Sequence, residues 1–137
     1  MPNLLVHVEQ YDVLGVLPSQ LESIRYLSLA MGGGRLAFVD ATLDGVRAPV
    51  GWTRYASLAD FLHAADAPLV AFDPDGSSIL QRRPSPDAWL LFGPSMGWTG
   101  DAFGGHSVDL VSIPGGVLNA RDVISIAAWE VSAWRAP

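Results

Sequence analysis

A glycine-rich segment that follows a short apolar run has the pattern of a hydrolase nucleophile. Gly93-Pro94-Ser95-Met96-Gly97 matches G-x-S-x-G directly after Ala88 to Phe92, the position at which α/β-hydrolases carry their catalytic serine. That serine also needs a helix behind it, and an acid and a histidine from separate strands. Asp101 and His106 follow Ser95 too closely for this arrangement, and the next residues do not predict a helix. A serine hydrolase using Ser95 therefore ranks third among the functions that the sequence suggests.

Three loops in the C-terminal third predict a different kind of site. Pro/Gly-rich loops follow two apolar segments, Ala88 to Phe92 and Val108 to Ile113, and a third loop leads into the last predicted helix. Loops of this kind that lie beside one another at strand ends form a pocket lined by main-chain groups. The chain has no cysteine, so a main-chain pocket is how it could hold a cofactor without thiolate ligands.

Other candidate residues favour structural roles. The histidines His7, His63 and His106 have no carboxylate or second histidine at ligand spacing, so we expect no metal site. The triple glycine at 32–34 lacks the Lys-Ser/Thr of a phosphate loop and follows a predicted helix, so it is expected to end that helix. The adjacent pair Arg82 and Arg83 is explained by a solvated loop at least as well as by RNA contact.

The N-terminal elements predict an α/β fold with a mainly parallel sheet flanked by helices. Asn3 to Val8 and Arg35 to Val39 read as buried strands, with a helix from about Gln20 to Met31 between them. Ser19 and Glu22 form a capping box at the expected start of this helix. A strand, helix, strand order indicates a βαβ unit and hence parallel pairing.

Further elements complete the sheet. A second cap at Ser57 opens a short helix through Ala64, Pro68 to Phe72 reads as a strand, and Asp73 to Gly76 reads as a turn. The strands at 88–92 and 108–113 lack apolar–polar alternation, which predicts that both are central in the sheet.

The last helix is expected to open at Asn119 and is apolar on two faces. Val123, Ala127 and Val131 lie on one face, and Ile126 and Trp129 lie on the other. A helix that is apolar on both sides is buried on both sides. The second face has no remaining element to meet in so small a chain, and this predicts a homodimer.

Composition and charge bound the remaining possibilities. At 137 residues, with 50% hydrophobic and 16% charged residues, the chain is expected to form a single globular domain over 1–137. It has no apolar run long enough to span a membrane and no signal-peptide pattern, so a cytoplasmic protein without membrane contact is expected. The net charge of −6 argues against strong nonspecific nucleic-acid binding.

The C-terminal loops resemble those of a known family. Phe92-Gly93-Pro94, Ile113-Pro114 and Leu118-Asn119 match, in order and spacing, the three cofactor loops of the SpoU branch of the SPOUT superfamily, the RNA 2′-O-ribose methyltransferases. Trp129-Glu130 matches the aromatic-Glu pair late in the family's last helix, and Pro18 to Arg25 lies where the family carries P-N-x-G-N-I-x-R. The similarity spans essentially the whole chain and is closest to the small tRNA wobble-position methyltransferases.

This resemblance implies a fold, a cofactor and a reaction. It implies a SPOUT-type α/β knot with a C-terminal deep trefoil knot, S-adenosyl-L-methionine (SAM) as cofactor, and a homodimer that meets through its first and last helices. It implies methylation of a ribose 2′-hydroxyl in tRNA or rRNA, with Arg25 at the position of the catalytic arginine. The cofactor-binding positions that it implies are Phe92, Gly93, Pro94, Gly97, Ile113, Pro114, Gly115, Leu118 and Asn119.

Several polar positions depart from the family pattern. Ser19 replaces the first asparagine of the helix motif, Ser95 replaces the loop glutamate, and Arg121 replaces a serine near the last helix. These are the three positions at which substrate contacts are expected. Because they have changed while the cofactor loops are kept, the alternative function is a catalytically inactive knotted homologue that acts as a binding or assembly module.

Overall fold

The protein is described here by a computed structural model covering residues 3–7, 17–39, 48–93, 98, 101–114 and 120–133, with the main chain alone at 17–20, 120–122 and 132–133. Its described strands form one six-stranded sheet in the order β3-β2-β1-β5-β4-β6. All five ladders are parallel, which confirms the expected parallel α/β architecture. The strands are β1 (Asn3–His7), β2 (Leu36–Val39), β3 (Trp52–Tyr55), β4 (Leu69–Ser78), β5 (Trp89–Phe92) and β6 (Val108–Ser112).

The predicted βαβ unit is present as β1, helix α1 (Leu17–Ala30) and β2. The capping-box prediction is wrong, because the helix begins at Leu17 and Ser19 lies inside it. Pro18 explains the earlier start, since a proline in the first helical turn lacks only an N–H that would be unpaired there. The expected stop is confirmed: Gly33 has φ +76° and donates its N–H to the Ser28 carbonyl at 2.8 Å.

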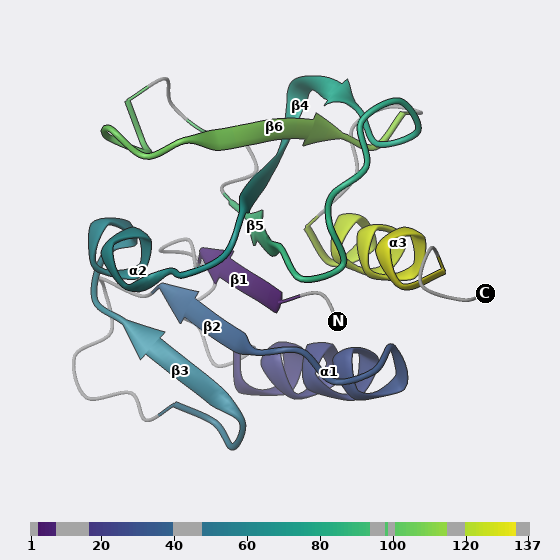
Figure 1. Ribbon diagram of the computed structural model, residues 1–137. Coiled ribbons are helices and arrows are strands. Elements are labelled where there is room, and N and C mark those ends of the chain that lie inside the picture. Colours follow the sequence, from purple (N-terminus) through teal and green to yellow (C-terminus); the bar gives the residue numbers. More distant parts are fainter. Residues whose placement is uncertain are drawn as a thin grey trace.

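Helices cover both faces of the sheet (Figure 1). Helices α1 and α3 (Ala120–Ala133) lie on one face, and α2 (Leu58–Ala64) lies on the other. The core on the α1–α3 face includes Leu4, Phe38 and Leu90, and the core on the α2 face includes Leu5 and Leu91. Alternate residues of β1 and β5 thus point to opposite cores, so these strands are buried on both sides.

The two strands predicted to be central differ in their position within the sheet. β5 pairs with both β1 and β4 and is buried throughout, which confirms the prediction. For β6 the prediction is wrong, because β6 pairs with β4 alone and leaves Asp109 and Leu110 exposed. An edge strand needs only one buried face, and Val111 is its one fully buried residue.

The turn predicted at Asp73 to Gly76 is a bulge within β4. Phe72 and Ser77 both stand opposite Val111, so the four residues between them are out of register with β6. Gly76 passes against β6 so closely that an added Cβ would lie 2.5 Å from the Val111 nitrogen. The Asp-Pro-Asp-Gly segment therefore interrupts the ladder without ending the strand.

The two remaining helices agree with the sequence where they are described. Ser57 caps α2, its hydroxyl accepting the Asp60 N–H at 3.1 Å. Helix α3 buries Ile124, Ala127 and Val131, whereas Trp129 is 60% exposed; its predicted cap, Asn119, lies outside the described residues. None of the helices in the described part of the chain is long and apolar enough to cross a bilayer.

Candidate functional site

The carboxyl ends of β1 and β5 lie beside Phe72 of β4 and are packed with aromatic rings. Val6 and Phe72 are the register partners of Phe92 on its two sides. The rings of Phe72 and Phe92 stack with centroids 4.9 Å apart and planes 13° apart. Phe92 is 2% exposed, so any contact that it makes with a cofactor would come through its main chain.

Gly93, the first residue after β5, packs directly against an indole ring. A Cβ built on Gly93 would lie 2.4 Å from Cε2 and Cζ2 of Trp98, so only glycine fits here while the indole stays in place. The indole also meets His7 edge-on at 5.9 Å and Phe103 at 5.1 Å. The space that Gly93 leaves open is thus filled by a side chain of the protein itself.

A buried carboxylate holds Trp98 at this position. Asp73, 8% exposed, accepts the Trp98 main-chain N–H on Oδ2 at 2.8 Å and the Asp75 N–H on Oδ1 at 2.9 Å. The indole Nε1–H is donated to the Phe72 carbonyl at 3.1 Å. Sequence motifs gave neither Asp73 nor Trp98 a functional role. The available signals were an acid directly after a buried strand and a tryptophan directly after a glycine.

The second predicted loop begins at the same edge of the sheet. Ile113 is partly buried against the core, and Pro114 is exposed. Both lie beyond Ser112, the last paired residue of β6. The structure therefore places Gly93, Ile113 and Pro114 past the carboxyl ends of strands in one sheet, with β4 between the two loops.

The other predicted site residues are described in part or not at all. Ser19 and Arg121 lie in α1 and α3, and their side chains are not described. The remaining ones lie outside the described residues: Pro94, Ser95, Gly97, Gly115, Leu118 and Asn119.

Arg25 lies on α1 and makes its described contacts away from these loops. Its guanidinium binds Glu22 at 3.0 Å and lies 5.0 Å from the ring centroid of Tyr26, and its Cδ would be 3.2 Å from a Cβ on Gly51. The hydrogen bond with Glu22 raises the pKa of Arg25 above its ordinary value and lowers the pKa of Glu22. Arg25 is therefore a permanent cation, and none of these contacts is shared with Phe92 or Gly93.

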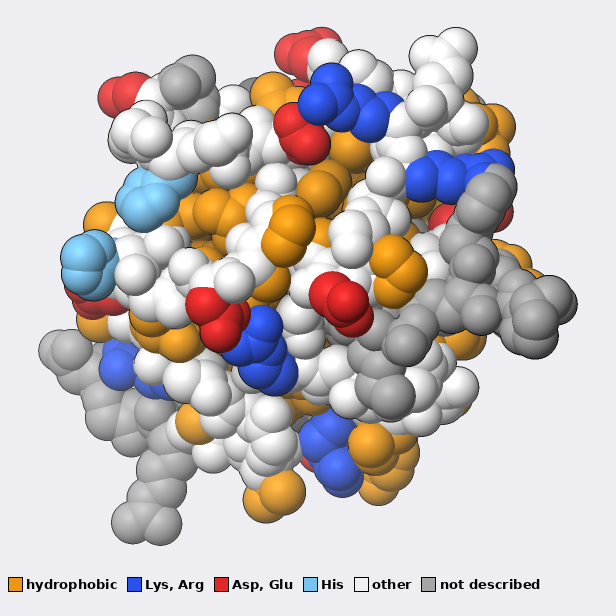
Figure 2. Space-filling model, in the orientation of Figure 1, with side chains coloured by type: hydrophobic (Ala, Val, Ile, Leu, Met, Phe, Trp, Pro, Cys, Tyr) orange, Lys and Arg blue, Asp and Glu red, His pale blue; other side chains and the backbone are white. Residues whose placement is uncertain are grey.

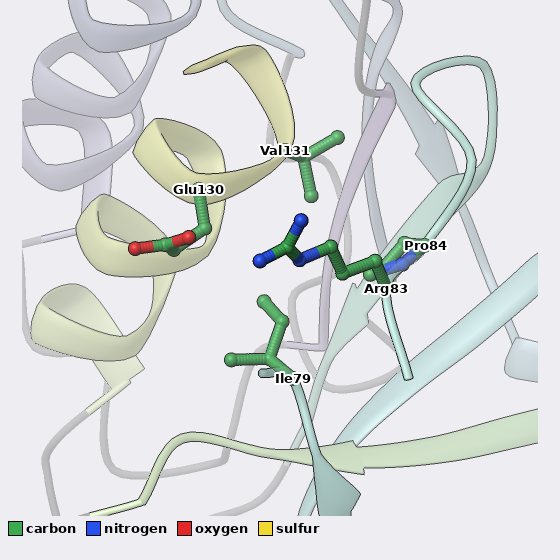
Figure 3. Close-up of a pocket in the computed structure, with 5 residues that line it drawn as sticks. All are labelled: Ile79, Arg83, Pro84, Glu130 and Val131. Carbon is green, nitrogen blue, oxygen red and sulfur yellow. The ribbon is translucent and has the colours of Figure 1, made fainter. Parts of the chain in front are cut away.

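A small pocket lies between α3 and the turn after β4. Ile79, Arg83, Pro84, Glu130 and Val131 line it, and Arg83 extends towards α3 (Figure 3). Its volume of about 10 Å³ is close to what a single water molecule requires, and none of the predicted cofactor residues lines it. The neighbouring Arg82 forms an ion pair with Asp109 at 2.9 Å.

Comparison with solved structures identifies the fold. A structure reported for 2-OH methylation of C/U34 on tRNA matches with a TM-score of 0.73 and 23% identity, over 96% of this chain and 93% of that one. The SpoU methyltransferase AviRb from Streptomyces viridochromogenes matches with a TM-score of 0.68 and 17% identity, over 98% of this chain and 60% of that one. The chain has the SpoU-type methyltransferase fold.

A third structure of this fold contains a cofactor. A Legionella pneumophila protein solved in complex with bound SAM matches with a TM-score of 0.67 and 13% identity, over 97% of this chain and 66% of that one. No family model and no curated protein sequence matches the chain. The similarity to SpoU-type methyltransferases therefore rests on the comparison of structures. The two larger SpoU-fold proteins extend well beyond the part that this chain spans.

Proposed function

We propose that this protein is a SAM-dependent RNA methyltransferase that acts on a ribose 2′-hydroxyl of tRNA or rRNA. The observation that carries the proposal is the match to the tRNA-methylation structure, which spans nearly the full length of both chains. Because a fold can host several functions, the local sequence must also agree. It does so in the loops that follow β5 and β6, at Gly93, Ile113 and Pro114.

The described residues at this edge fit a cofactor held through main-chain and small apolar groups. Gly93 and Pro114 lie beyond the last ladder positions, in the place where open parallel sheets bind ligands. Together with the loop positions implied by the family resemblance, they would hold SAM. The cofactor would supply an electrophilic methyl group for transfer to the ribose oxygen.

Arg25 is assigned a positioning role in this reaction. Since the hydrogen bond with Glu22 raises the pKa of Arg25 above its ordinary value, Arg25 cannot accept the proton of a hydroxyl group at physiological pH. A fixed guanidinium can instead bind a phosphate oxygen of the RNA and orient the nucleotide. On this proposal Arg25 exchanges part of its contact with Glu22 for the RNA phosphate.

Two copies of the chain are proposed to associate through α1 and α3. The two helices contact each other, and both expose large apolar side chains: Tyr26 and Leu29 on α1, and Ile126 and Trp129 on α3. This arrangement supports the homodimer expected from the two apolar faces of the last helix. The same proposal includes a single knotted domain over 1–137, with the trefoil knot formed by the C-terminal loops.

The charge distribution suggests how RNA would be bound. Arg25, Arg35 and Arg82 are each paired with a carboxylate, and basic and acidic side chains lie next to one another across the face shown in Figure 2. Nonspecific RNA binding relies on unpaired cations that neutralise phosphates. We therefore propose that recognition depends on a few local contacts, and that affinity for bulk RNA is weak.

Calorimetry with SAM, followed by transfer of a labelled methyl group to total tRNA and to rRNA, tests this proposal. The expected result is cofactor binding followed by label in ribose 2′-O-methyl nucleosides after RNA digestion. Failure to bind SAM at millimolar concentration would overturn the proposal. Binding without transfer to either RNA would identify the inactive homologue instead, and label in a base would refute the 2′-hydroxyl assignment.

A further inference from the structure

Asp73 and Trp98 form a connection across the carboxyl edge of the sheet that the proposed function does not yet explain. Trp98 follows Gly93 by five positions, and the cofactor loop predicted from the sequence lies between them. Trp98 is attached to β4 at two points: its main-chain N–H binds Asp73, and its indole N–H binds the Phe72 carbonyl. Gly93 is held in turn by β5, which pairs with β4 through Phe72 and Phe92.

The carboxylate of Asp73 is well suited to holding Trp98 in place. A carboxylate that is 8% exposed is costly to bury unless its oxygens are hydrogen-bonded, and both oxygens of Asp73 accept main-chain N–H groups. Hydrogen bonds to a charged acceptor are shorter and stronger than neutral ones, consistent with the 2.8 Å contact to Trp98. The main-chain N–H of Trp98 is thus bound by a carboxylate rather than by a neighbouring strand.

We infer that Asp73 and Trp98 are positioning residues that hold Gly93, at the carboxyl end of β5, in place for cofactor binding. The indole lies against the side of Gly93 on which other residues carry a Cβ, and so limits how Gly93 can move. The Asp73 carboxylate in turn binds the main chain of Trp98 to β4. The inference rests on the proposed function, because Gly93 is assigned to SAM binding there.

Two variants remove one contact each. Asp73→Asn keeps the size of the side chain but replaces one of its two acceptor oxygens with a donor group. Trp98→Phe keeps an aromatic ring but removes the N–H that binds the Phe72 carbonyl. We expect each variant to weaken SAM binding about tenfold, the effect of losing one well-made hydrogen bond to a preorganised site.

Trp52→Phe is the matched control. Trp52 is buried and donates its Nε1–H to the Leu21 carbonyl at 3.2 Å, so this variant loses the same kind of bond on the α1 side of the sheet. If Asp73 and Trp98 acted only through global stability, Trp52→Phe would weaken SAM binding as much as they do. We expect its SAM affinity to stay within about twofold of the wild type.

Amide hydrogen exchange at Trp98, measured in the same proteins without cofactor, tests the anchoring of Trp98 independently of SAM binding. We expect Asp73→Asn to speed exchange of the Trp98 main-chain N–H about tenfold or more, and Trp52→Phe to leave it unchanged. Unchanged exchange in Asp73→Asn would overturn the anchoring, whatever the cofactor result. If the wild type binds SAM and both variants bind it equally well, the positioning role is wrong. If the wild type does not bind SAM, the proposed function fails together with the cofactor role, while exchange still decides the anchoring.

Discussion

The contact between Gly93 and Trp98 predicts a large cost for the smallest possible substitution. In Gly93→Ala the new methyl group would lie 2.4 Å from two ring carbons of Trp98, whereas carbon atoms pack at ~3.5–4.0 Å. The ring must therefore move by more than about 1 Å. Overpacking of this kind costs ~1–3 kcal/mol, and loss of the indole bond to Phe72 adds about 1 kcal/mol.

We expect Gly93→Ala to lower the free energy of unfolding by about 2–4 kcal/mol. At about 4 °C per kcal/mol for a chain of this length, the melting temperature should fall by roughly 8–16 °C. Urea and thermal unfolding followed by circular dichroism would measure both quantities. In a Trp98→Ala background the obstacle is gone, and the same substitution should cost less than about 0.5 kcal/mol.

Gly105→Ala serves as the control, because a Cβ added there meets nothing within 4 Å. It should leave stability unchanged or slightly raised. Equal costs for Gly93→Ala with and without Trp98 would refute the packing argument, since the two positions would then be energetically independent.

Three further outcomes are expected. Light scattering should give the mass of two chains, and Trp129→Asp should give one; Leu80→Asp is the control, because Leu80 is as exposed as Trp129, 59% against 60%, but lies in the turn after β4. Since Arg25 holds the pKa of the Glu22 carboxyl below its ordinary value of 4.5, the stability that this pair contributes is complete above that pH and is lost as the pH falls through the lowered pKa. Glu22→Gln should therefore lower the melting temperature at neutral pH, and the difference should shrink as the pH falls below 4.5; a difference that stays the same in acid would contradict this assignment. Leu5→Ala, at a fully buried position, should cost ~2–5 kcal/mol in urea unfolding, and a cost below about 1 kcal/mol would show that Leu5 is not in the core.

Much of the fold follows from local sequence signals. The capping serine at 57 and the glycines after α1 act on neighbouring main-chain groups, so their effects could be predicted without knowledge of tertiary contacts. The start of α1 was missed because Pro18 and Ser19 are both acceptable near a helix N-terminus. The neighbouring positions alone do not decide between them.

The other missed features depend on residues distant in sequence. Whether a strand is central or at an edge depends on how many strands pair with it. Among the described strands, β6 pairs with β4 alone. The Asp73–Trp98 bond joins residues 25 positions apart, and no local sequence pattern connects the two. The loops of the candidate site could thus be predicted from the sequence, but the contact between Asp73 and Trp98 could not.

The position of β1 has a consequence during synthesis of the chain. β1 lies between β2, which is made shortly afterwards, and β5. The Asn3 side chain donates to the Asp87 carbonyl, 84 residues later. At a synthesis rate of ~5–20 residues per second, this edge of β1 stays unpaired for roughly 4–17 s before its partner has been made. During that interval an apolar strand with one unpaired edge is available to other nascent chains, so the N-terminal half of this protein is the part expected to need chaperone protection.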